Sequence, residues 1–231
     1  MGQVVARTGA IYGRWIAANG WSEALGLGTT LALGWRIAPS LERATGVLTV
    51  LAGALAAVLM GMVLEGVVVG AAQGAVVHRA LPTLSRRSWV LATVLGAGIA
   101  WILGMIPSTI MALRPETGAP PPAEPSALVQ YPLAAALGLV TGPILGLAQW
   151  MVLRRYVAHA GRWLWANALA WGVGMPVIFL GMDRVPWNSQ AFAIIATIYA
   201  VCAVTGAVVG AIHGRFLLRL VQAPLPTAPA R

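Results

Sequence analysis

The sequence predicts an all-α membrane protein of six transmembrane helices, arranged as three parallel two-helix repeats in a pseudo-threefold bundle. Three observations lead to this fold class: a scarcity of charge, a series of long apolar runs, and a residue pattern that recurs three times. Apolar residues make up 59% of the chain and charged residues 9%, where a soluble domain has roughly 25% charged residues. This small number of charged residues cannot solvate a globular surface. Most of the chain is therefore expected to face lipid.

Five apolar runs are long enough to cross a bilayer, which takes about 20 apolar residues. They cover residues 46–77, 88–113, 126–153, 163–182 and 189–214. A sixth run, 16–38, is less apolar because it contains Asn19 and Glu23. On its own, this run is equally compatible with an amphipathic helix that lies on the membrane surface.

An internal repeat assigns this first run to the membrane. Trp15, Trp89 and Trp163 are separated by 74 residues each, and Asn19, Thr93 and Asn167 follow them at the same offset. A second series recurs with Gly66, Gly142 and Gly206, then Gly70, Gly146 and Gly210, then Gln73, Gln149 and His213, and last Arg79, Arg155 and Arg219. We therefore expect units at about 14–79, 88–155 and 162–219 within one transmembrane domain, 1–222.

Charge placement predicts the orientation. With six spans and an inner N-terminus, the inner side receives eleven Arg and no acidic residue. The outer side receives equal numbers of both signs: Arg36, Arg43, Arg114 and Arg184 against Glu42, Glu116, Glu124 and Asp183. Arg-rich loops resist translocation, so both termini are expected in the cytoplasm. The Pro-rich stretch 114–125 is expected to be an extended outer loop, and 223–231 a disordered tail.

Each recurring residue type has a physical role in this prediction. Small residues let two helix backbones approach closely, so the paired glycines are expected to pack helices together. We expect the faces that carry these glycines and the Gln or His to converge on a central axis. The Trp at each outward start and the Arg at each inward end are expected to anchor the helices at the membrane interface.

One segment resembles a known group of sequences. The resemblance is carried by GPILGLAQWMVLRR at 142–155 and AGRWLWAN at 160–167. These stretches are similar to uncharacterised multi-pass membrane proteins of bacteria that carry a Gly-x-x-x-Gly-x-x-Gln-Trp-x-x-Leu-Arg pattern. The first and third units depart from it, because Gly74 and Gly214 stand where the second has Trp150. The resemblance implies a multi-pass protein of the bacterial inner (cytoplasmic) membrane and no particular activity.

Glu65 is the strongest candidate for a functional residue. A carboxylate inside a span costs about 2.5–3.5 kcal/mol on insertion scales. It could carry a proton, bind a cation or pair with an Arg. The alternative is a neutral, hydrogen-bonded glutamic acid that ties helices together, a task left to Thr141 and Thr205 at the same repeat position. Glu23 lies nearer the inner face, and we expect it at the interface.

Gln73, Gln149 and His213 are predicted to form a quasi-symmetric polar ring. It could be a constriction on a water path or a belt of hydrogen bonds between helices. His213 is the single candidate for an axial ligand to a metal or porphyrin, but no partner ligand is spaced to assist it. No metal and no cofactor is therefore predicted.

The sequence contains no catalytic motif, so we expect a protein that is not an enzyme. Cys202 is the only cysteine, and the arginines do not form the basic face that nucleic-acid binding needs. The favoured hypothesis is a membrane subunit that contacts lipids and packs against other membrane proteins or copies of itself, for example in a respiratory or photosynthetic assembly. The alternatives are a small channel or transporter along the threefold axis, and a pigment- or haem-binding protein.

Overall fold

A computed structural model of the chain describes residues 2–42, 46–114 and 125–223. Within these residues the protein is all-helical, with six α-helices in the order α1 (Gly2–Glu42), α2 (Val47–Ala80), α3 (Arg86–Ala112), α4 (Ala127–Leu153), α5 (Arg162–Met182) and α6 (Ala191–Val221). Almost all of the predicted tail and of the predicted Pro-rich loop lies outside the described residues, as do Arg43, Glu116, Glu124 and Arg231.

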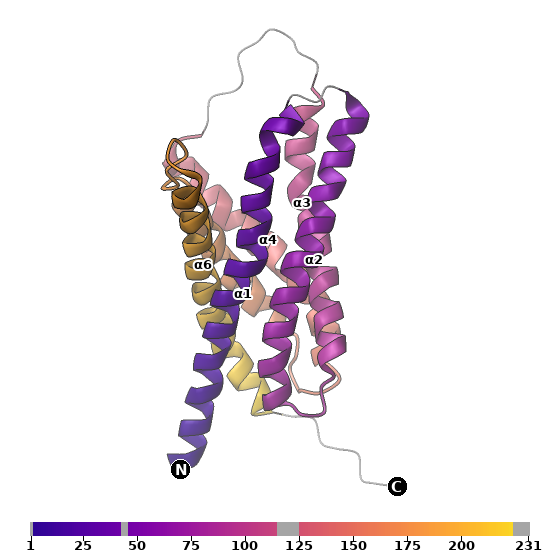
Figure 1. The fold of residues 1–231 in the computed structure, drawn as a ribbon. Helices are drawn as coiled ribbons and strands as arrows, with labels where there is room; N and C mark the ends of the chain where they lie inside the picture. The colour runs from indigo at the N-terminus through magenta and orange to yellow at the C-terminus, as the bar shows by residue number, and fades with distance from the viewer. Residues whose placement is uncertain (1, 43–45, 115–124, 224–231) are drawn as a thin grey trace.

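The six helices form a closed ring. Each helix packs against the one before and the one after it in sequence, and α6 packs against α1 (Figure 1). The most extensive pairings are α6 with α1, α2 with α3, and α4 with α5. The closest pairs therefore join the returning helix of one predicted unit to the outgoing helix of the next.

Five of the described helices, α2 to α6, are long and apolar enough to cross a membrane. Helix α1 is not among them, and its polar residues explain why. Asn19, Ser22, Glu23 and Thr30 are all buried in the ring. They lower the average hydropathy of α1 although they do not face the surroundings of the bundle.

The two ends of the bundle differ in charge. The start of α1, the end of α6 and the connections 81–85 and 154–161 lie at one end (Figure 1). We call this the arginine-rich end, because its helix termini and connections carry Arg79, Arg86, Arg87, Arg154, Arg155, Arg162, Arg215 and Arg219. Arg36, Arg114 and Arg184 belong to the opposite end.

The α2–α3 connection shows how local sequence ends one helix and begins another. Helix α2 stops before Pro82, which cannot donate a backbone hydrogen bond and disfavours helical geometry in the residue before it. Ser85 then caps α3, accepting a hydrogen bond from the Ser88 backbone N–H at 3.4 Å. The turn places Trp89 in the first turns of α3, facing the centre of the ring.

A tryptophan cluster fills the ring near the arginine-rich end. Trp15, Trp89 and Trp163 are each 0% exposed. The Trp163 ring lies 6.0 Å from that of Trp15 and 5.9 Å from that of Trp89, both in edge-on contact. The prediction that these three side chains anchor the protein in the headgroup layer is therefore wrong. The centre of a six-helix ring is wide, and large indole rings fill it.

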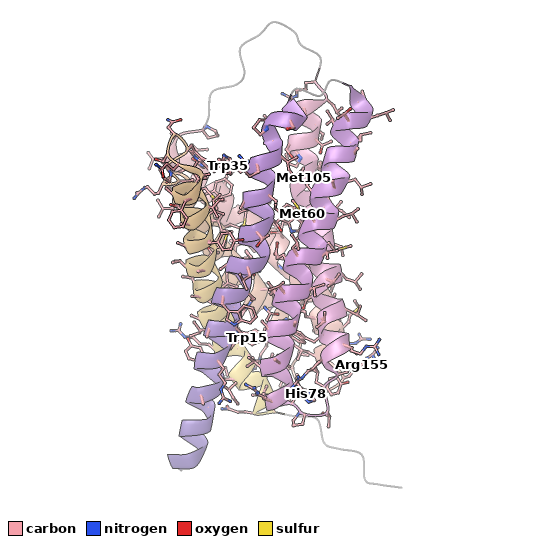
Figure 2. The ribbon with its side chains drawn as sticks, viewed as in Figure 1. Trp15, Trp35, Met60, His78, Met105 and Arg155 are labelled. Atoms are coloured by element: carbon pink, nitrogen blue, oxygen red, sulfur yellow. The ribbon has the colours of Figure 1, made fainter. Side chains whose placement is uncertain are left out.

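Arg79, Arg155 and Arg219 are exposed at the ends of α2, α4 and α6, close to this cluster (Arg155 and Trp15 are labelled in Figure 2). An exposed guanidinium at a helix C-terminus suits both lipid phosphate and the helix dipole. Their role as anchors stays a prediction.

The paired glycines lie where two helices of the chain come closest. A Cβ on Gly66 of α2 would lie 2.8 Å from the Val94 Cα of α3. One on Gly146 of α4 would lie 2.6 Å from the Asn167 side chain of α5, and one on Gly210 of α6 would lie 2.9 Å from Asn19 of α1. Gly70, Gly142 and Gly206 occupy the same three interfaces. The glycines therefore pack against the neighbouring helix and do not meet one another on the axis, whereas Gln73, Gln149 and His213 on the same helices line a common interior cavity.

Candidate functional site

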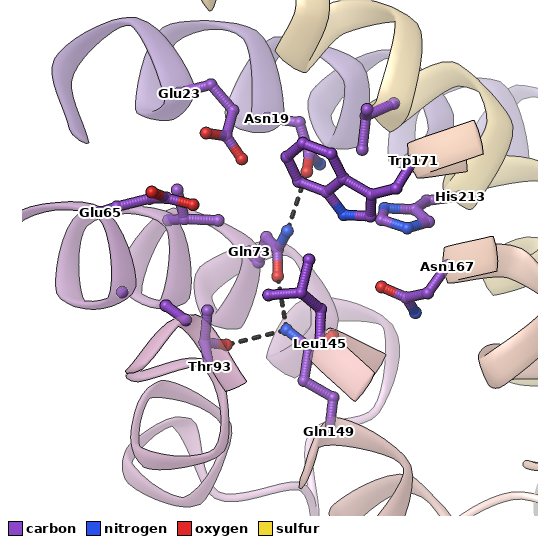
Figure 3. A pocket seen from close by; sticks show the side chains of 14 residues that line it. Asn19, Glu23, Glu65, Gln73, Thr93, Leu145, Gln149, Asn167, Trp171 and His213 are labelled. Atoms are coloured by element: carbon purple, nitrogen blue, oxygen red, sulfur yellow. Dashed lines mark hydrogen bonds between the residues drawn. The ribbon is translucent and has the colours of Figure 1, made fainter. Parts of the chain in front are cut away.

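A small polar cavity lies inside the ring, next to the tryptophan cluster. Its volume is about 30 Å³, and all six helices contribute to its wall (Figure 3). A space of this size holds roughly two water molecules. Its polar lining consists of Asn19, Glu23, Glu65, Gln73, Thr93, Gln149, Asn167 and His213.

A chain of amide hydrogen bonds runs along one side of this cavity. The Gln73 Nε2 donates to Asn19 Oδ1 at 2.8 Å. The Gln149 Nε2 donates to Gln73 Oε1 at 3.0 Å and to Thr93 Oγ1 at 2.9 Å (Figure 3). The two predicted ring glutamines therefore bond directly to each other and link α1, α2, α3 and α4.

The tryptophan cluster supplies further donors to the same amides. Trp89 Nε1 donates to Gln73 Oε1 at 3.3 Å, and Trp163 Nε1 donates to Gln149 Oε1 at 2.9 Å. The third pair, Trp15 and His213, is different. Their ring centroids are 6.5 Å apart, and neither Trp15 Nε1 nor either nitrogen of His213 has a hydrogen-bond partner.

His213 reaches the cavity but has no room for a large ligand. It is 3% exposed and lies against the Trp163 ring, with centroids 5.1 Å apart. The space beside it admits water and excludes a tetrapyrrole, so this site does not fit the axial-ligand hypothesis. Among the described residues, no group of three or more His, Cys, Asp or Glu could hold a metal ion.

Glu65 and Glu23 line the same cavity. Glu65 Oε2 accepts a hydrogen bond from Trp101 Nε1 at 2.8 Å. Glu23 is 2% exposed, and its Oε2 has no partner. Glu23 was expected at the interface, and its burial corrects that expectation. Helix α1 packs so closely on α2 that a Cβ on Gly26 would lie 2.8 Å from the Glu65 Cα.

Thr141 and Thr205 share the repeat position of Glu65 but do not line this cavity. The Thr141 hydroxyl donates to the Leu137 carbonyl of its own helix at 2.8 Å. Thr205 is 0% exposed, and its hydroxyl has no partner. Neither threonine replaces Glu65 in the cavity.

Asn19, Thr93 and Asn167 are repeat markers in the sequence, which does not by itself assign them to the site. All three line the cavity, one from each outgoing helix. The signal was present in their constant offset from the three tryptophans. An offset of four places two residues on the same helix face, so they point in the same direction as the buried indoles.

A second, larger cavity of about 580 Å³ lies in the half of the bundle away from the arginine-rich end. Its walls are mainly apolar residues of α1, α2 and α3, including Trp35, Met60 and Met105 (Figure 2). Three of the four hydroxyls that line it are bonded within their own helices, and the fourth belongs to Thr49. Thr30 donates to Gly26 O at 2.9 Å, and Ser108 and Thr109 donate to Met105 O at 3.0 and 2.7 Å.

Trp101 separates the two cavities. Its ring lines the apolar cavity, and its N–H is bonded to Glu65 in the polar one. The ring lies directly across Gly61 of α2, where any Cβ would overlap it. The sequence contained no signal for this role, since Trp101 falls in neither repeated series.

No protein-family model, curated protein or solved structure matches the chain. The resemblance to uncharacterised bacterial membrane proteins therefore stays a prediction.

Proposed function

We propose that the chain is a multi-pass membrane protein in which all six helices span, as three two-helix units about a pseudo-threefold axis. The inclusion of α1 is supported by its place in the ring, where it packs along both α6 and α2. The polar residues that weaken its hydropathy are buried inside the bundle. A helix with such a core-facing side needs apolar residues only on its outer side to meet lipid.

The threefold arrangement is supported by the positions that meet in the interior. The three tryptophans form one cluster, and the cavity is lined by Asn19, Thr93 and Asn167, by Val69, Leu145 and Val209, and by Gln73, Gln149 and His213. Each set contains one residue from each predicted unit. The three closest helix pairs, α6 with α1, α2 with α3 and α4 with α5, are likewise equivalent, because each joins one predicted unit to the next.

The arginine-rich end is proposed to face the cytoplasm of a bacterial cell, which follows from the positive-inside rule and the resemblance. Single cysteines test this orientation, because Cys202 is buried and is expected to be slow to react. We expect Pro82→Cys, in the α2–α3 connection, to react with an impermeant maleimide only after the membrane is permeabilised. Asn188→Cys, in the α5–α6 connection, should react in intact spheroplasts. The reverse pattern would contradict the proposed orientation.

We further propose that the protein is non-enzymatic and binds a hydrocarbon chain of a membrane lipid. The observation that carries this proposal is the apolar cavity of about 580 Å³. Ligand sites in proteins occupy about 300–1,000 Å³ and are mostly apolar. Three of the four hydroxyls that line the cavity, those of Thr30, Ser108 and Thr109, are already bonded within their own helices, so few polar groups remain to orient a polar ligand.

The end of α1 supports an anionic lipid in particular. Arg36 is exposed, and its guanidinium lies 5.8 Å from the ring centroid of Trp35. Trp35 itself lines the apolar cavity. A chain in the cavity would therefore bring its headgroup close to a cation held on an aromatic face, an arrangement suited to phosphate.

The proposal is tested with phosphatidylglycerol that carries a photoreactive acyl chain, added to the full chain in nanodiscs. Ala57→Phe projects a ring into the cavity, whereas Ala56→Phe on the same helix places it on the exposed face. We expect several-fold less labelling of α2 and α3 in Ala57→Phe and unchanged labelling in Ala56→Phe. Equal labelling of the two variants would overturn lipid binding in this cavity.

A membrane-subunit role is the second candidate, and the outer surface of α2 favours it. The most apolar window of α2 is 11% buried, against 28–33% for the other four candidate spans. This surface carries the exposed side chains of Leu51, Leu55 and Leu59, against which a partner helix would pack. Gentle purification followed by mass spectrometry tests this role, and a lone chain without stoichiometric partners would count against it.

Conduction along the axis has less support. The cluster of Trp15, Trp89 and Trp163 fills the axis near the arginine-rich end, together with Leu84, Leu153 and Leu217. The chain's own outgoing helices pack against the paired glycines of the returning helices. Pigment binding also has less support, because the residues that line the larger cavity include no His, Cys, Asp or Glu that would ligate the metal of a pigment.

A further inference from the structure

The buried polar atoms that lack a hydrogen-bond partner gather on two neighbouring helices. Among the described residues they are Trp15 Nε1 and Glu23 Oε2 on α1, and Thr205 Oγ1, His213 Nδ1 and His213 Nε2 on α6. Buried polar groups are almost always paired in native proteins, with water where no protein atom is available. The α1–α6 interface is therefore where the structure calls for a small polar occupant.

Space for that occupant is present beside two of these side chains. Glu23 and His213 both line the polar cavity of about 30 Å³, and they are 2% and 3% exposed. Roughly two water molecules fit. Water can donate to the free oxygen of Glu23 and to an imidazole nitrogen of His213.

The charges around Glu23 call for a positive partner. Glu65 of α2 and His213 of α6 line the cavity with it, and Cys202 is a further buried residue of α6. No arginine lines the cavity. An unpaired carboxylate at this depth is costly, and a proton that arrives through water is the simplest compensation.

We propose that Glu23, His213 and water held in the cavity that both side chains line form a buried proton-binding site. The proton resides on the Glu23 carboxyl or on the His213 imidazole. It moves from carboxyl to water while the water passes a proton to the imidazole nitrogen, which leaves carboxylate and imidazolium. This proposal is independent of lipid binding in the larger cavity.

The site occurs once in the threefold pattern, because both of its residues differ from their counterparts in the other two units. The positions that match Glu23, eight residues after the repeated Trp, are Ala97 and Trp171. The positions that match His213 are Gln73 and Gln149, and their oxygens already accept the Trp89 and Trp163 N–H groups. His213→Gln is therefore a substitution that the same surroundings already accommodate twice in this chain.

Infrared difference spectroscopy of the full chain in nanodiscs, between about pH 8 and about pH 4, tests the site. We expect a buried carboxylic C=O band that Glu23→Gln removes. His213→Gln should shift this band, because the water in the cavity loses an imidazole partner. Asp183→Asn, at an exposed carboxylate, should leave the band unchanged. A band unaffected by Glu23→Gln, or equally positioned in His213→Gln, would overturn the proposal.

Tryptophan fluorescence of the unsubstituted chain is a second readout that needs no Glu23 variant. An imidazolium at His213 would lie next to Trp163 and Trp15 and quench them. We expect a reversible loss of emission on acidification that His213→Gln abolishes. If the same acid quenching persists in His213→Gln, the imidazole does not take the proton, and the proposed exchange is wrong.

Discussion

At the scale of single residues, the interior depends on side chains that serve several helices at once. Gln73 is the clearest case, because its amide donates to Asn19 on α1 and accepts from Trp89 on α3 and Gln149 on α4. Each bond is modest by itself. The cost of removing Gln73 comes from the buried partners that would be left without hydrogen bonds.

Gln73→Leu should therefore destabilise the protein by about 1–3 kcal/mol, since Asn19, Trp89 and Gln149 each lose a buried hydrogen bond. Thermal unfolding in one detergent measures this as a lowered transition. Gln222→Leu, at an exposed residue after α6, is the control and should change stability by less than about 0.5 kcal/mol. Similar transitions for both variants would show that the amide chain does not stabilise the bundle.

At the scale of helices, close packing of α4 on α5 depends on glycine. A Cβ on Gly142 would overlap the Asn167 backbone of α5, whereas a Cβ on Gly104 of α3 would meet nothing within 4 Å. Both glycines are helical. The two positions differ in their surroundings and share the same intrinsic helix propensity.

Gly142→Ala is expected to destabilise the fold by about 1–3 kcal/mol, because the two helices must separate to admit the methyl group. Gly104→Ala should be neutral or stabilising by up to about 1 kcal/mol, because alanine favours the helix. The comparison uses the same unfolding assay. A stabilising Gly142→Ala would contradict the close approach of α4 and α5.

At the scale of the whole molecule, contact between α1 and α6 closes the ring and brings together residues nearly 200 positions apart. Tyr12 donates to the Ala211 carbonyl at 3.0 Å, and Thr29 and Tyr199 share a hydrogen bond of 2.7 Å. These bonds join α1 to α6 near both ends of their contact. The proton-binding site lies between them.

Closure of the ring is tested by a disulfide. A Cβ on Gly20 would lie 3.6 Å from the Ala207 Cβ, within the range that a disulfide spans. We expect the pair Gly20→Cys and Ala207→Cys to cross-link within one chain under mild oxidation, with loss of both thiols by mass. Gly34→Cys with Ala207→Cys should stay reduced. Failure of the first pair to cross-link would contradict the α1–α6 interface.

Much of the architecture could be predicted from residue patterns. Hydropathy identifies the five apolar helices because lipid selects apolar residues over a fixed length. The constant offsets of Trp15, Trp89 and Trp163 indicated that 16–38 is helical like its counterparts. The same offsets predicted that Gln73, Gln149 and His213 belong together, and all three line one cavity.

The direction in which these residues point could not be predicted. A tryptophan near a helix end is equally suited to lipid headgroups and to a wide interior, and sequence spacing is the same in both cases. The position of Glu23 was likewise misjudged, because its depth depends on how α1 tilts against α2 and α6. Gly66 and its counterparts were expected to face the axis, whereas helix pairing around the ring turned them toward a neighbour.

The sequence by itself therefore determined the helical membrane class, the recurring positions and the residues that break the pattern, Glu65 and His213. These follow from composition and periodicity, which are local properties of the chain. Only the tertiary structure decided that Glu23 joins them in one cavity, that Trp101 divides this cavity from a larger apolar one, and that the unpaired polar atoms gather between α1 and α6. The physical reason is that closing the ring pairs the first helix with the last, a contact that no local pattern encodes.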